Sequence, residues 1–409
     1  MRKLTSGRSV WLQRDRPTRA QSYASLNGHI AVDVVVVGGG MTGSTVASVF
    51  ASAGIRVALV EAALVGRGST AASTALLLRE PDLGLIELGR RYGAARARRI
   101  WQLSQIAAHD FVRSLRRLEI DCDLAERDSV YYTTNPETVE QLRAECWRRR
   151  NAGFGGEWLT PGAVRRLTGI AGHGAIRTRG NAQCDPYKAC LGLLRAARRS
   201  GAAIFERSAV QRIERGRSGV RVVTARGTLA AAQVVIATGY ATPAFQPLVG
   251  RFRLHHTYVL ATKRISKRQR WELGLNDVML WDTERPYHYA RWAADERLLL
   301  GGADRPAVAG RGRAAAFRQG TRELREYFEA RLPALAEVGI DYAWEGVFAM
   351  TPDGLPYIGT HRRYPQHLFA LGYGGNGMTF GFLAARILLE RWQGVESADH
   401  DLFGFGRHR

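Results

Sequence analysis

The stretch VVVVGGGMTG at residues 34–43 joins four valines directly to a cluster of glycines. A short β-branched run of this kind is typical of a buried parallel strand that is covered on both faces. Gly38, Gly40 and Gly43 follow the valines in GxGxxG register, and residues 41–53 have the pattern of a helix that ends at Gly54. The stretch therefore predicts a strand, a tight turn and a helix that begins at the turn.

A second strand is expected at residues 55–60 (IRVALV), and it leads directly into Glu61. In a dinucleotide-binding unit the first glycine makes the tight turn, the second lets the backbone approach the pyrophosphate, and the third lets the helix pack closely on the strand. The helix start offers N–H groups and the positive end of its dipole to the phosphates. Glu61 would accept hydrogen bonds from the adenosine ribose and would repel a 2′-phosphate, which argues against NADP. NAD and FAD both remain open at this point.

The overall composition describes a globular protein large enough for two domains, with 409 residues of which 45% are hydrophobic. No apolar run approaches the length of a membrane span, and no hydrophobic segment follows the basic residues at the N-terminus, so we expect a cytoplasmic protein. The four cysteines show neither CxxC spacing nor a companion pair of histidines, which argues against a metal site or a disulfide framework.

The formal net charge is +22, and the positive charge is almost entirely arginine. Of the 59 basic residues only Lys3, Lys188, Lys263 and Lys267 are lysines, which leaves 55 arginines scattered along the chain. A positive field raises the local concentration of anionic partners such as a dinucleotide, a nucleic acid or an acidic metabolite. The scatter favours a compositional bias over a dedicated nucleic-acid surface.

Three distant segments extend the dinucleotide hypothesis. Residues 233–239 (QVVIATG) predict another buried strand, residues 351–359 read TPDGLPYIG, and residues 371–392 (LGYGGNGMTFGFLAARILLERW) place a second glycine cluster at the start of a second helix. A simple nicotinamide dehydrogenase usually has a contiguous Rossmann half, whereas the later strands here return far downstream. A second helix start suits a second site of developing negative charge.

Together these segments resemble the D-amino acid oxidase superfamily of flavoproteins, which contains glycine oxidase, sarcosine oxidase and the γ-glutamylputrescine oxidases. The resemblance runs from about Ser9 to the C-terminus. It rests on SVWLQ at 9–13, GRGSTAAST at 66–74, CDPYKACLGLLRAARRSGA at 184–202, VVIATGY at 234–240, RPYHYARWAADERLLLGG at 285–302 and the two C-terminal segments. It implies an α/β plus α+β fold, in which a discontinuous Rossmann-like FAD-binding domain of the GxGxxG type carries a substrate domain with an antiparallel sheet.

This likeness and the local patterns predict the division of the chain. We expect an N-terminal extension at 1–30, an FAD-binding domain formed by 31–80, 160–250 and 341–409, and a substrate-binding domain formed by 81–159 and 251–340. Residues 253–263, 278–284, 287–292 and 297–302 are candidate strands of the substrate domain.

The resemblance also implies the cofactor and its contacts. In this family hydride moves from the carbon beside an amine nitrogen to the flavin, and the imine that forms is hydrolysed by water. The glycine segment near the C-terminus would stabilise the reduced flavin through its backbone N–H groups. The expected FAD contacts are Gly38, Gly40, Met41, Thr42, Gly43, Glu61, Ser69, Thr70, Thr74, Val210, Thr238, Gly239, Asp353, Gly374, Gly375, Asn376, Gly377, Met378 and Thr379.

Three departures from well-studied relatives narrow this expectation. Gly346 stands where sarcosine oxidase carries the cysteine bonded to its flavin, and the segment GSTAAST has no counterpart of the histidine used for flavin attachment in the dimethylglycine dehydrogenase group. We therefore expect noncovalent FAD; the cysteine pattern already argues against a metal. Leu299 stands where sarcosine oxidase has the lysine that activates oxygen, so the electron acceptor is either oxygen or another compound. Phe348 stands where glycine oxidase binds the substrate carboxylate with an arginine.

The candidate catalytic residues are Tyr287, Tyr289, Arg291 and Asn376. Strand alternation places the two tyrosines and Arg291 on one face of a strand of the substrate domain. They would either line a pocket over the flavin or belong to a half-buried aromatic strand. Because Phe348 cannot grip a carboxylate as an arginine does, an amine without an adjacent carboxylate is favoured unless Arg291 or another arginine from a neighbouring strand substitutes.

We therefore expect an enzyme that oxidises a C–N bond of a small-molecule amine or amino acid with FAD. Two alternatives remain open. One is a flavin dehydrogenase with an acceptor other than oxygen. The other is an RNA-associated flavoprotein that acts on a modified tRNA side-chain amine, although nucleic acid is not the partner that the sequence favours.

Overall fold

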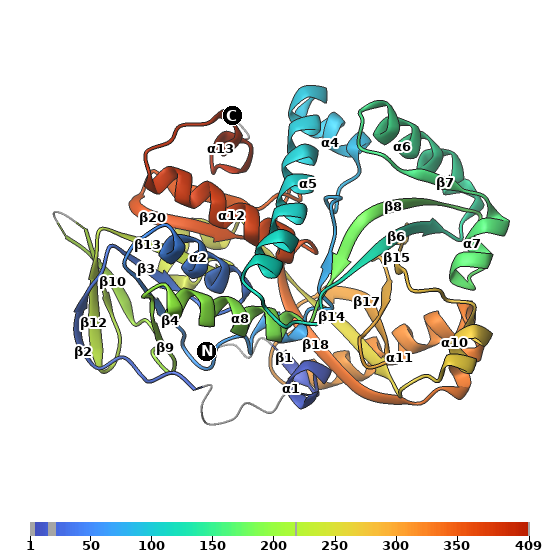
Figure 1. The fold of residues 1–409 in the computed structure, drawn as a ribbon, viewed down its shortest axis with the longest axis horizontal. Coiled ribbons are helices and arrows are strands. Elements are labelled where there is room, and N and C mark those ends of the chain that lie inside the picture. The colour runs from blue at the N-terminus through green and yellow to red at the C-terminus, as the bar shows by residue number, and fades with distance from the viewer. Residues whose placement is uncertain (1–4, 15–21, 217–218, 408–409) are drawn as a thin grey trace.

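Three β-sheets and the helices packed on them form the protein (Figure 1). The computed structural model describes residues 5–14, 22–216 and 219–407. Of the predicted extension at 1–30, residues 1–4 and 15–21 lie outside the described part. Its strand β1 (Thr5–Gly7) pairs with β18 (Ile340–Met350), and its helix α1 (Val10–Arg14) buries Trp11, whose indole N–H donates to the Ser73 carbonyl at 2.8 Å.

The glycine-rich stretch lies in a six-stranded sheet. Its order is β19 (Tyr357–His361), β20 (Tyr364–Leu371), β13 (Gln233–Gly239), β3 (Val34–Val37), β4 (Val57–Val60) and β9 (Ala203–Phe205). All neighbouring pairs are parallel except β19 with β20. Helices α2 (Met41–Ser52), α8 (Pro186–Arg199) and α12 (Gly377–Trp392) pack together on one face of the sheet. The predicted Rossmann-like unit, assembled from distant segments, is confirmed.

The strand order decides where the functional loops meet. Strands β3, β4, β13 and β20 are parallel, so their carboxyl ends lie at one edge of the sheet. The residues that follow them are Gly38, Glu61, the end of β13 at Gly239, and the glycine cluster that begins at Gly372. In open parallel sheets ligands bind outside this edge.

A four-stranded sheet covers the other face of the six-stranded sheet. Its order is β10 (Arg212–Arg215), β11 (Val220–Val223), β12 (Gly227–Ala231) and β2 (Gly28–Ala31). Val35 and Val234 of the larger sheet form one apolar cluster with Val222 and Leu229 of the smaller one. The hairpin of β11 and β12 comes just before QVVIATG in the chain, and it shields the buried valines from water.

A ten-stranded sheet forms the second half of the molecule, on the right in Figure 1. Its order is β1, β18, β14 (Arg253–Thr262), β17 (Leu298–Pro306), β16 (Tyr289–Trp292), β15 (Met279–Asp282), β6 (Ala125–Thr133), β8 (Gly174–Gln183) and β5 (Leu76–Leu77), with β7 (Glu157–Leu159) also paired to β8. All pairs are antiparallel except β15 with β6. The predicted antiparallel sheet is therefore present, with one parallel pair.

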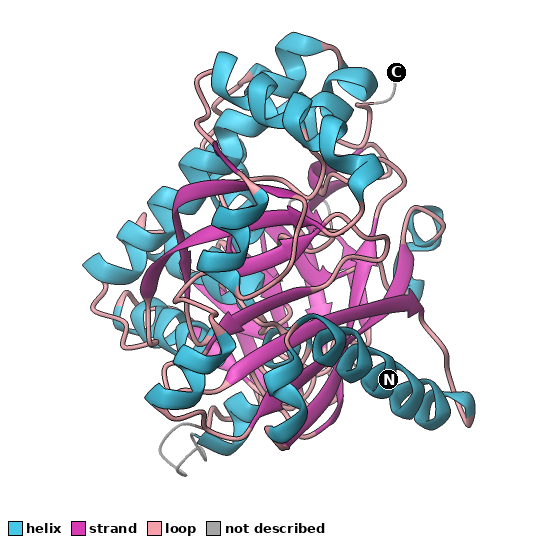
Figure 2. Cartoon of the chain, turned by 90° about the vertical axis from the view of Figure 1, so that its right-hand side faces the viewer, coloured by secondary structure: helices cyan, strands magenta, loops and turns pink. Residues whose placement is uncertain are grey.

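Helices cover the large sheet, and in Figure 2 they surround the strands that run through the middle of the molecule. They are α4 (Leu85–Tyr92), α5 (Ala94–Arg117), α6 (Val139–Asn151), α7 (Pro161–Thr168), α10 (Lys267–Leu273) and α11 (Gly312–Arg331). Leu324 and Phe328 of α11 pack with Tyr258 of β14 in an apolar core. Helix α5 lies between the two halves and contacts α12. Among the described residues, no helix is both long enough and apolar enough to cross a lipid bilayer.

The sheets divide the chain differently from the predicted boundaries in two places. Strand β8, within the segment 160–250, pairs with β6 and β5 of the ten-stranded sheet. Strand β18, at the start of the segment 341–409, pairs with β14 of the same sheet. The chain therefore returns to the six-stranded sheet and its helices only after β8, at α8, and again after β18, at β19. Sequence pattern could not assign these two strands to a sheet, because pairing depends on residues far away along the chain.

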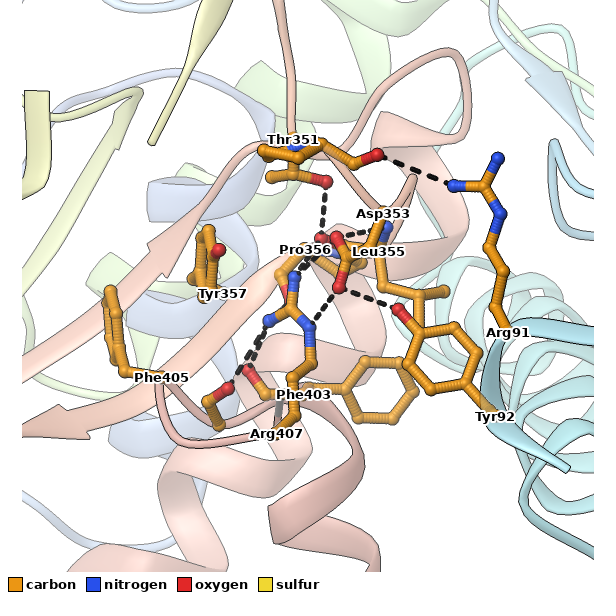
Figure 3. Close-up of polar contacts among 12 residues, drawn as sticks. Arg91, Tyr92, Thr351, Asp353, Leu355, Pro356, Tyr357, Phe403, Phe405 and Arg407 are labelled. Atoms are coloured by element: carbon orange, nitrogen blue, oxygen red, sulfur yellow. Dashed lines mark hydrogen bonds and ion pairs between the residues drawn. The ribbon is translucent and has the colours of Figure 1, made fainter. Parts of the chain in front are cut away.

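Asp353 is one residue whose predicted role changes in the structure. It forms a buried ion pair with Arg407, with the Nε–Oδ2 distance at 2.5 Å, and it accepts a hydrogen bond from the Tyr92 hydroxyl at 2.6 Å (Figure 3). Arg407 also donates to the carbonyls of Leu355 and Phe403. Burial alone would raise the pKa of Asp353, but the hydrogen bond and charge of Arg407 hold it well below its ordinary value. The pair fastens the C-terminal segment to α4 and to the TPDG turn.

Replacing Arg407 tests this role. Arg407→Ala is expected to lower the free energy of unfolding by roughly 3 kcal/mol, because removing one partner leaves a buried carboxylate uncompensated. Chemical denaturation monitored by tryptophan fluorescence measures the change. Arg362→Ala, at an exposed position, is the control and should stay within about 0.5 kcal/mol of the parent. Equal effects of the two substitutions would contradict the role given to the pair.

Candidate active site

One cavity of about 670 Å³ lies at the carboxyl edge of the six-stranded sheet. The turn after β3, the end of β4, the end of β13 and the turn before α12 supply one side of its lining. Strands β14 to β18 of the ten-stranded sheet supply the other side. The cavity therefore joins the two glycine clusters and is closed by the large sheet.

The first glycine cluster brings a helix start against a strand end. Gly38 has φ +111°, a conformation that side chains other than glycine rarely adopt. A Cβ atom on Gly43 would overlap the carbonyl oxygen of Gly38, so only glycine allows α2 this close to the turn. Gly40 precedes the helix and offers no side chain to cap it. The N–H groups of the first helical turn thus face the cavity wall, where an anion would be stabilised.

Two side chains hold this turn from outside. The Thr70 hydroxyl accepts a hydrogen bond from the Met41 N–H at 2.9 Å. The Glu61 carboxylate accepts one from Gly39 N–H and one from Ala63 N–H, each at 2.8 Å. Each carboxylate oxygen retains further acceptor capacity, so Glu61 is held in place and can still receive a hydroxyl from a ligand. This arrangement fits the ribose of a dinucleotide.

The second glycine cluster is fastened to residues 78–82. The Asn376 amide donates to the Glu80 carbonyl at 2.6 Å, the Thr379 hydroxyl donates to the Leu78 carbonyl at 2.8 Å, and the Gly375 N–H donates to the Asp82 carboxylate at 2.6 Å. Helix α12 begins at Gly377, on the cavity wall. Its start is therefore a second fixed group of backbone N–H donors.

Most of the predicted cofactor contacts lie on the wall of this cavity. They are Gly38, Gly40, Met41, Thr42, Glu61, Ser69, Thr70, Thr74, Val210, Thr238, Gly239, Gly374, Gly375, Asn376, Gly377 and Met378. These residues come from six separate stretches of the chain, and the fold brings them to one surface. Their contact with a cofactor stays a prediction.

Three predicted contacts lie elsewhere. Gly43 is engaged in the packing of α2 on the Gly38 turn, which is the third-glycine role expected for the motif. Thr379 points its hydroxyl to the Leu78 carbonyl. Asp353 belongs to the ion pair with Arg407. Each of the three supports the architecture, and none is part of the cavity lining.

Arg291 does not line the cavity either. Its side chain is buried, with 2% exposure, and its guanidinium donates to the carbonyls of Thr74, Cys184 and Trp292. Arg291 lies two residues after Tyr289 on β16, but its guanidinium is bound to backbone carbonyls and does not face the cavity. Its guanidinium is therefore not placed to bind a carboxylate in the cavity.

The two predicted tyrosines do reach the cavity. The Tyr289 hydroxyl lies 3.0 Å from the Thr257 hydroxyl, and the Tyr287 ring lies 5.9 Å from the Tyr289 ring, centroid to centroid. Burial raises the pKa of both tyrosines above the ordinary value. Both are therefore neutral hydroxyls at physiological pH. Phe348 also lines the cavity, whereas Leu299 is buried in the apolar core.

Sequence reasoning missed two carboxylates in the cavity, Asp82 and Asp304. A β-bulge turns Asp304 inward, because the pairing of β14 with β17 shifts between His256 and Tyr258. The available signal was an aspartate that ends the apolar run LLLGGAD. Asp82 follows a proline in a loop, where no helix or strand periodicity indicates which way its side chain points.

Both carboxylates are hard to ionise in this setting. Burial raises the pKa of Asp82 to about 6, against the lowering effect of the Gly375 N–H and the charge of Arg285. Burial, together with the charge of Asp82, raises the pKa of Asp304 to about 7, although a hydrogen bond with Thr257 opposes the shift. Carboxylates with raised pKa values in a cavity are typical of sites that handle a charged ligand or a proton.

Known proteins resemble the chain over most of its length. A family model described as FAD dependent oxidoreductase (DAO) matches residues 33–391. γ-Glutamylputrescine oxidoreductase of Escherichia coli K12 is 29% identical over 387 residues, covering 92% of this chain and 87% of that protein. A glycine oxidase of Bacillus licheniformis is 28% identical over 351 residues, covering 85% and 89%. The crystal structure of glycine oxidase from Geobacillus kaustophilus has a TM-score of 0.77 at 23% identity, covering 93% of this chain and 98% of that one.

The raised pKa of Asp304 predicts how stability depends on pH. Because the folded-state value of about 7 exceeds the ordinary 3.8, ionisation destabilises the folded state increasingly between these two values. Asp304→Asn removes this penalty and should stabilise the protein at pH 8 by roughly 2–3 kcal/mol more than at pH 5. Urea unfolding at both pH values measures the difference. The folded-state pKa of Asp353 is lowered, so Asp353→Asn is the opposite control and should destabilise the protein at pH 8. An Asp304→Asn variant less stable than the parent at pH 8 would refute the argument.

Proposed function

The chain belongs to the DAO family of FAD-dependent oxidoreductases, and from this premise we propose that it oxidises a C–N bond of an amine or amino acid with noncovalently bound FAD. The observation that carries the proposal is the single cavity that joins two helix starts at the edge of one sheet and ends beneath the strands of another. The first start suits phosphates, and the second suits a ring system that gains negative charge.

The residues on the cavity wall fit the parts of FAD. The bare backbone at Gly38 and Gly40 and the start of α2 would hold the pyrophosphate. The fixed carboxylate of Glu61 would receive the ribose hydroxyls, and its charge would oppose a 2′-phosphate. The turn from Gly374 to Met378 would face the ring system. Bound FAD would supply acceptance of a hydride from the carbon beside the substrate nitrogen, after which water hydrolyses the imine.

Noncovalent binding is supported by the composition of the wall. The cavity-lining residues include no cysteine and no histidine within the described chain. Gly346 lies on the wall in place of an attachment cysteine, and a Cβ atom there would lie 2.6 Å from the Cβ of Ala72. A larger residue at this position would therefore displace the segment after Glu61 that lines the same cavity.

The residues at the reacting end act by positioning. Tyr287 and Tyr289 present neutral hydroxyls to the cavity, and Thr257 orients the hydroxyl of Tyr289. Asn376 holds the turn before α12 through the Glu80 carbonyl, so it sets the direction of the N–H groups that follow. The ten-stranded sheet covers this end and excludes water from it. An amine bound here would lie between the two sheets.

Anaerobic mixing tests the proposed reaction. The purified yellow protein is mixed without oxygen with primary amines, N-methyl amino acids and D-amino acids, and the flavin absorbance is followed. At least one of these classes should bleach the flavin, while NADH should not. Acid precipitation should release the FAD into the supernatant, because the attachment is noncovalent.

Readmitting oxygen then distinguishes the two classes of acceptor. Rapid recovery of the yellow colour with release of hydrogen peroxide identifies an oxidase, and slow recovery identifies a dehydrogenase that uses another acceptor. Protein that holds FAD but is bleached only by NADH would rule out amine oxidation.

A further inference from the structure

We propose that Asp82 and Asp304 form the binding site for the positive charges of the substrate, and that this substrate is an aliphatic diamine rather than an amino acid. The inference rests on the proposed function and adds the substrate class to it. It concerns this chain's own side chains at the covered end of the cavity.

The two carboxylates come from separate elements and both line the cavity. Asp304 is turned inward by the bulge in β17, and its Oδ1 atom is buried without a hydrogen-bond partner among the described residues. Asp82 accepts one hydrogen bond from Gly375. A buried carboxylate oxygen with no donor is destabilising by itself, so a ligand that donates a proton or brings a positive charge would stabilise it.

Tyr287 lies near both carboxylates. A Cβ atom on Gly375 would meet both the Tyr287 hydroxyl and the Asp82 carboxylate, so these two groups flank the same glycine. The charges of both Asp82 and Asp304 raise the pKa of Tyr287, in addition to the larger effect of burial. The three groups therefore lie within electrostatic reach of one another at one end of the cavity.

Among the described residues of the cavity wall, no arginine or lysine is placed to bind a substrate carboxylate near Asp82 and Asp304. Arg67 is the one arginine or lysine in the lining, and it lies in the loop whose Gly66 N–H bonds to the Gly39 carbonyl at the glycine turn. Arg285 is exposed and donates to the carbonyls of Thr283 and Glu284, although its charge lowers the pKa of Asp82. Phe348 occupies the place of a carboxylate-binding arginine. A substrate carboxylate would meet two like charges here and no fixed counter-ion.

The remaining wall at this end is aromatic. Trp281, Tyr287, Tyr289 and Phe348 line it, and Trp281 is held by a stacked Tyr131 at 3.8 Å between ring centroids. Aromatic faces attract ammonium groups and also pack against methylene chains. Two carboxylates with aromatic walls between them suit two ammonium groups joined by an alkyl chain.

Charge neutralisation ranks the possible ligands. A diamine can neutralise both carboxylates, a monoamine leaves one of them uncompensated, and an amino acid adds a third negative charge. Loss of one partner from a close buried charge pair weakens binding by 2–5 kcal/mol, and each 1.4 kcal/mol is a factor of ten. Removing either carboxylate should therefore weaken diamine binding by roughly 30-fold or more.

The test measures binding to holoenzyme whose flavin has been reduced with dithionite, so that no turnover can occur. Isothermal titration calorimetry without oxygen compares 1,4-diaminobutane, n-butylamine and glycine. The diamine should bind at least tenfold more tightly than butylamine, and glycine should not bind measurably. Asp304→Asn and Asp82→Asn should each remove most of the preference for the diamine over the monoamine. Glu396 is an exposed carboxylate outside the cavity lining, so Glu396→Gln should leave the preference for the diamine unchanged.

The outcomes separate this inference from the proposed function. FAD content and anaerobic bleaching are measured on the same preparation. If amino acids bleach the flavin and glycine binds as tightly as the diamine, the inference is overturned while amine or amino-acid oxidation stands. The inference is also overturned if Asp304→Asn slows bleaching but keeps the preference for the diamine, because the carboxylate would then act only as a proton acceptor. Protein that is not bleached by any compound of the panel overturns the proposed function itself.

Discussion

The close approach of Gly43 to the Gly38 carbonyl is the contact on which the rest of the site depends. Because Gly43 has no side chain, α2 can begin directly against the end of β3. This close approach directs the first N–H groups of the helix toward the cavity. The parallel pairing of β3 with β4 and β13 then brings Glu61 and Gly239 to the same edge. A steric constraint at one glycine thus sets the position of residues supplied by three strands.

The second glycine cluster is placed by a different kind of interaction. Residues 78–82 hold it through the Leu78 and Glu80 carbonyls and the Asp82 carboxylate, which receive hydrogen bonds from Thr379, Asn376 and Gly375. The segment that positions the start of α12 therefore also supplies a carboxylate to the cavity. In the proposed enzyme this short piece of chain would link the position of the cofactor to the carboxylate that binds the substrate.

Sequence pattern could predict those parts of the site that depend on local geometry. The strand, glycines, helix and acidic residue between Val34 and Glu61 follow directly from spacing, and the second helix start at Gly377 follows from its glycines. Arg291 and Asp353 could not be assigned correctly, because their partners lie on backbone and side chains far away in sequence. Asp304 was missed because a bulge reverses the direction that simple alternation gives its side chain. The sheet membership of β8 and β18 likewise depends on distant pairing.

FAD binding should therefore depend on the absence of a side chain at Gly43, in the first turn of α2. The decisive measurement is the FAD dissociation constant of Gly43→Ala, obtained by titrating apoprotein and following flavin fluorescence, beside that of Gly89→Ala. Gly89 is also helical, and a Cβ atom there would meet nothing within 4 Å. Gly43→Ala should bind FAD roughly 10- to 100-fold more weakly, because the displaced helix start would lose a hydrogen bond to the charged pyrophosphate, worth about 1.5–3 kcal/mol, while Gly89→Ala should match the parent. Undiminished FAD affinity in Gly43→Ala would contradict the account.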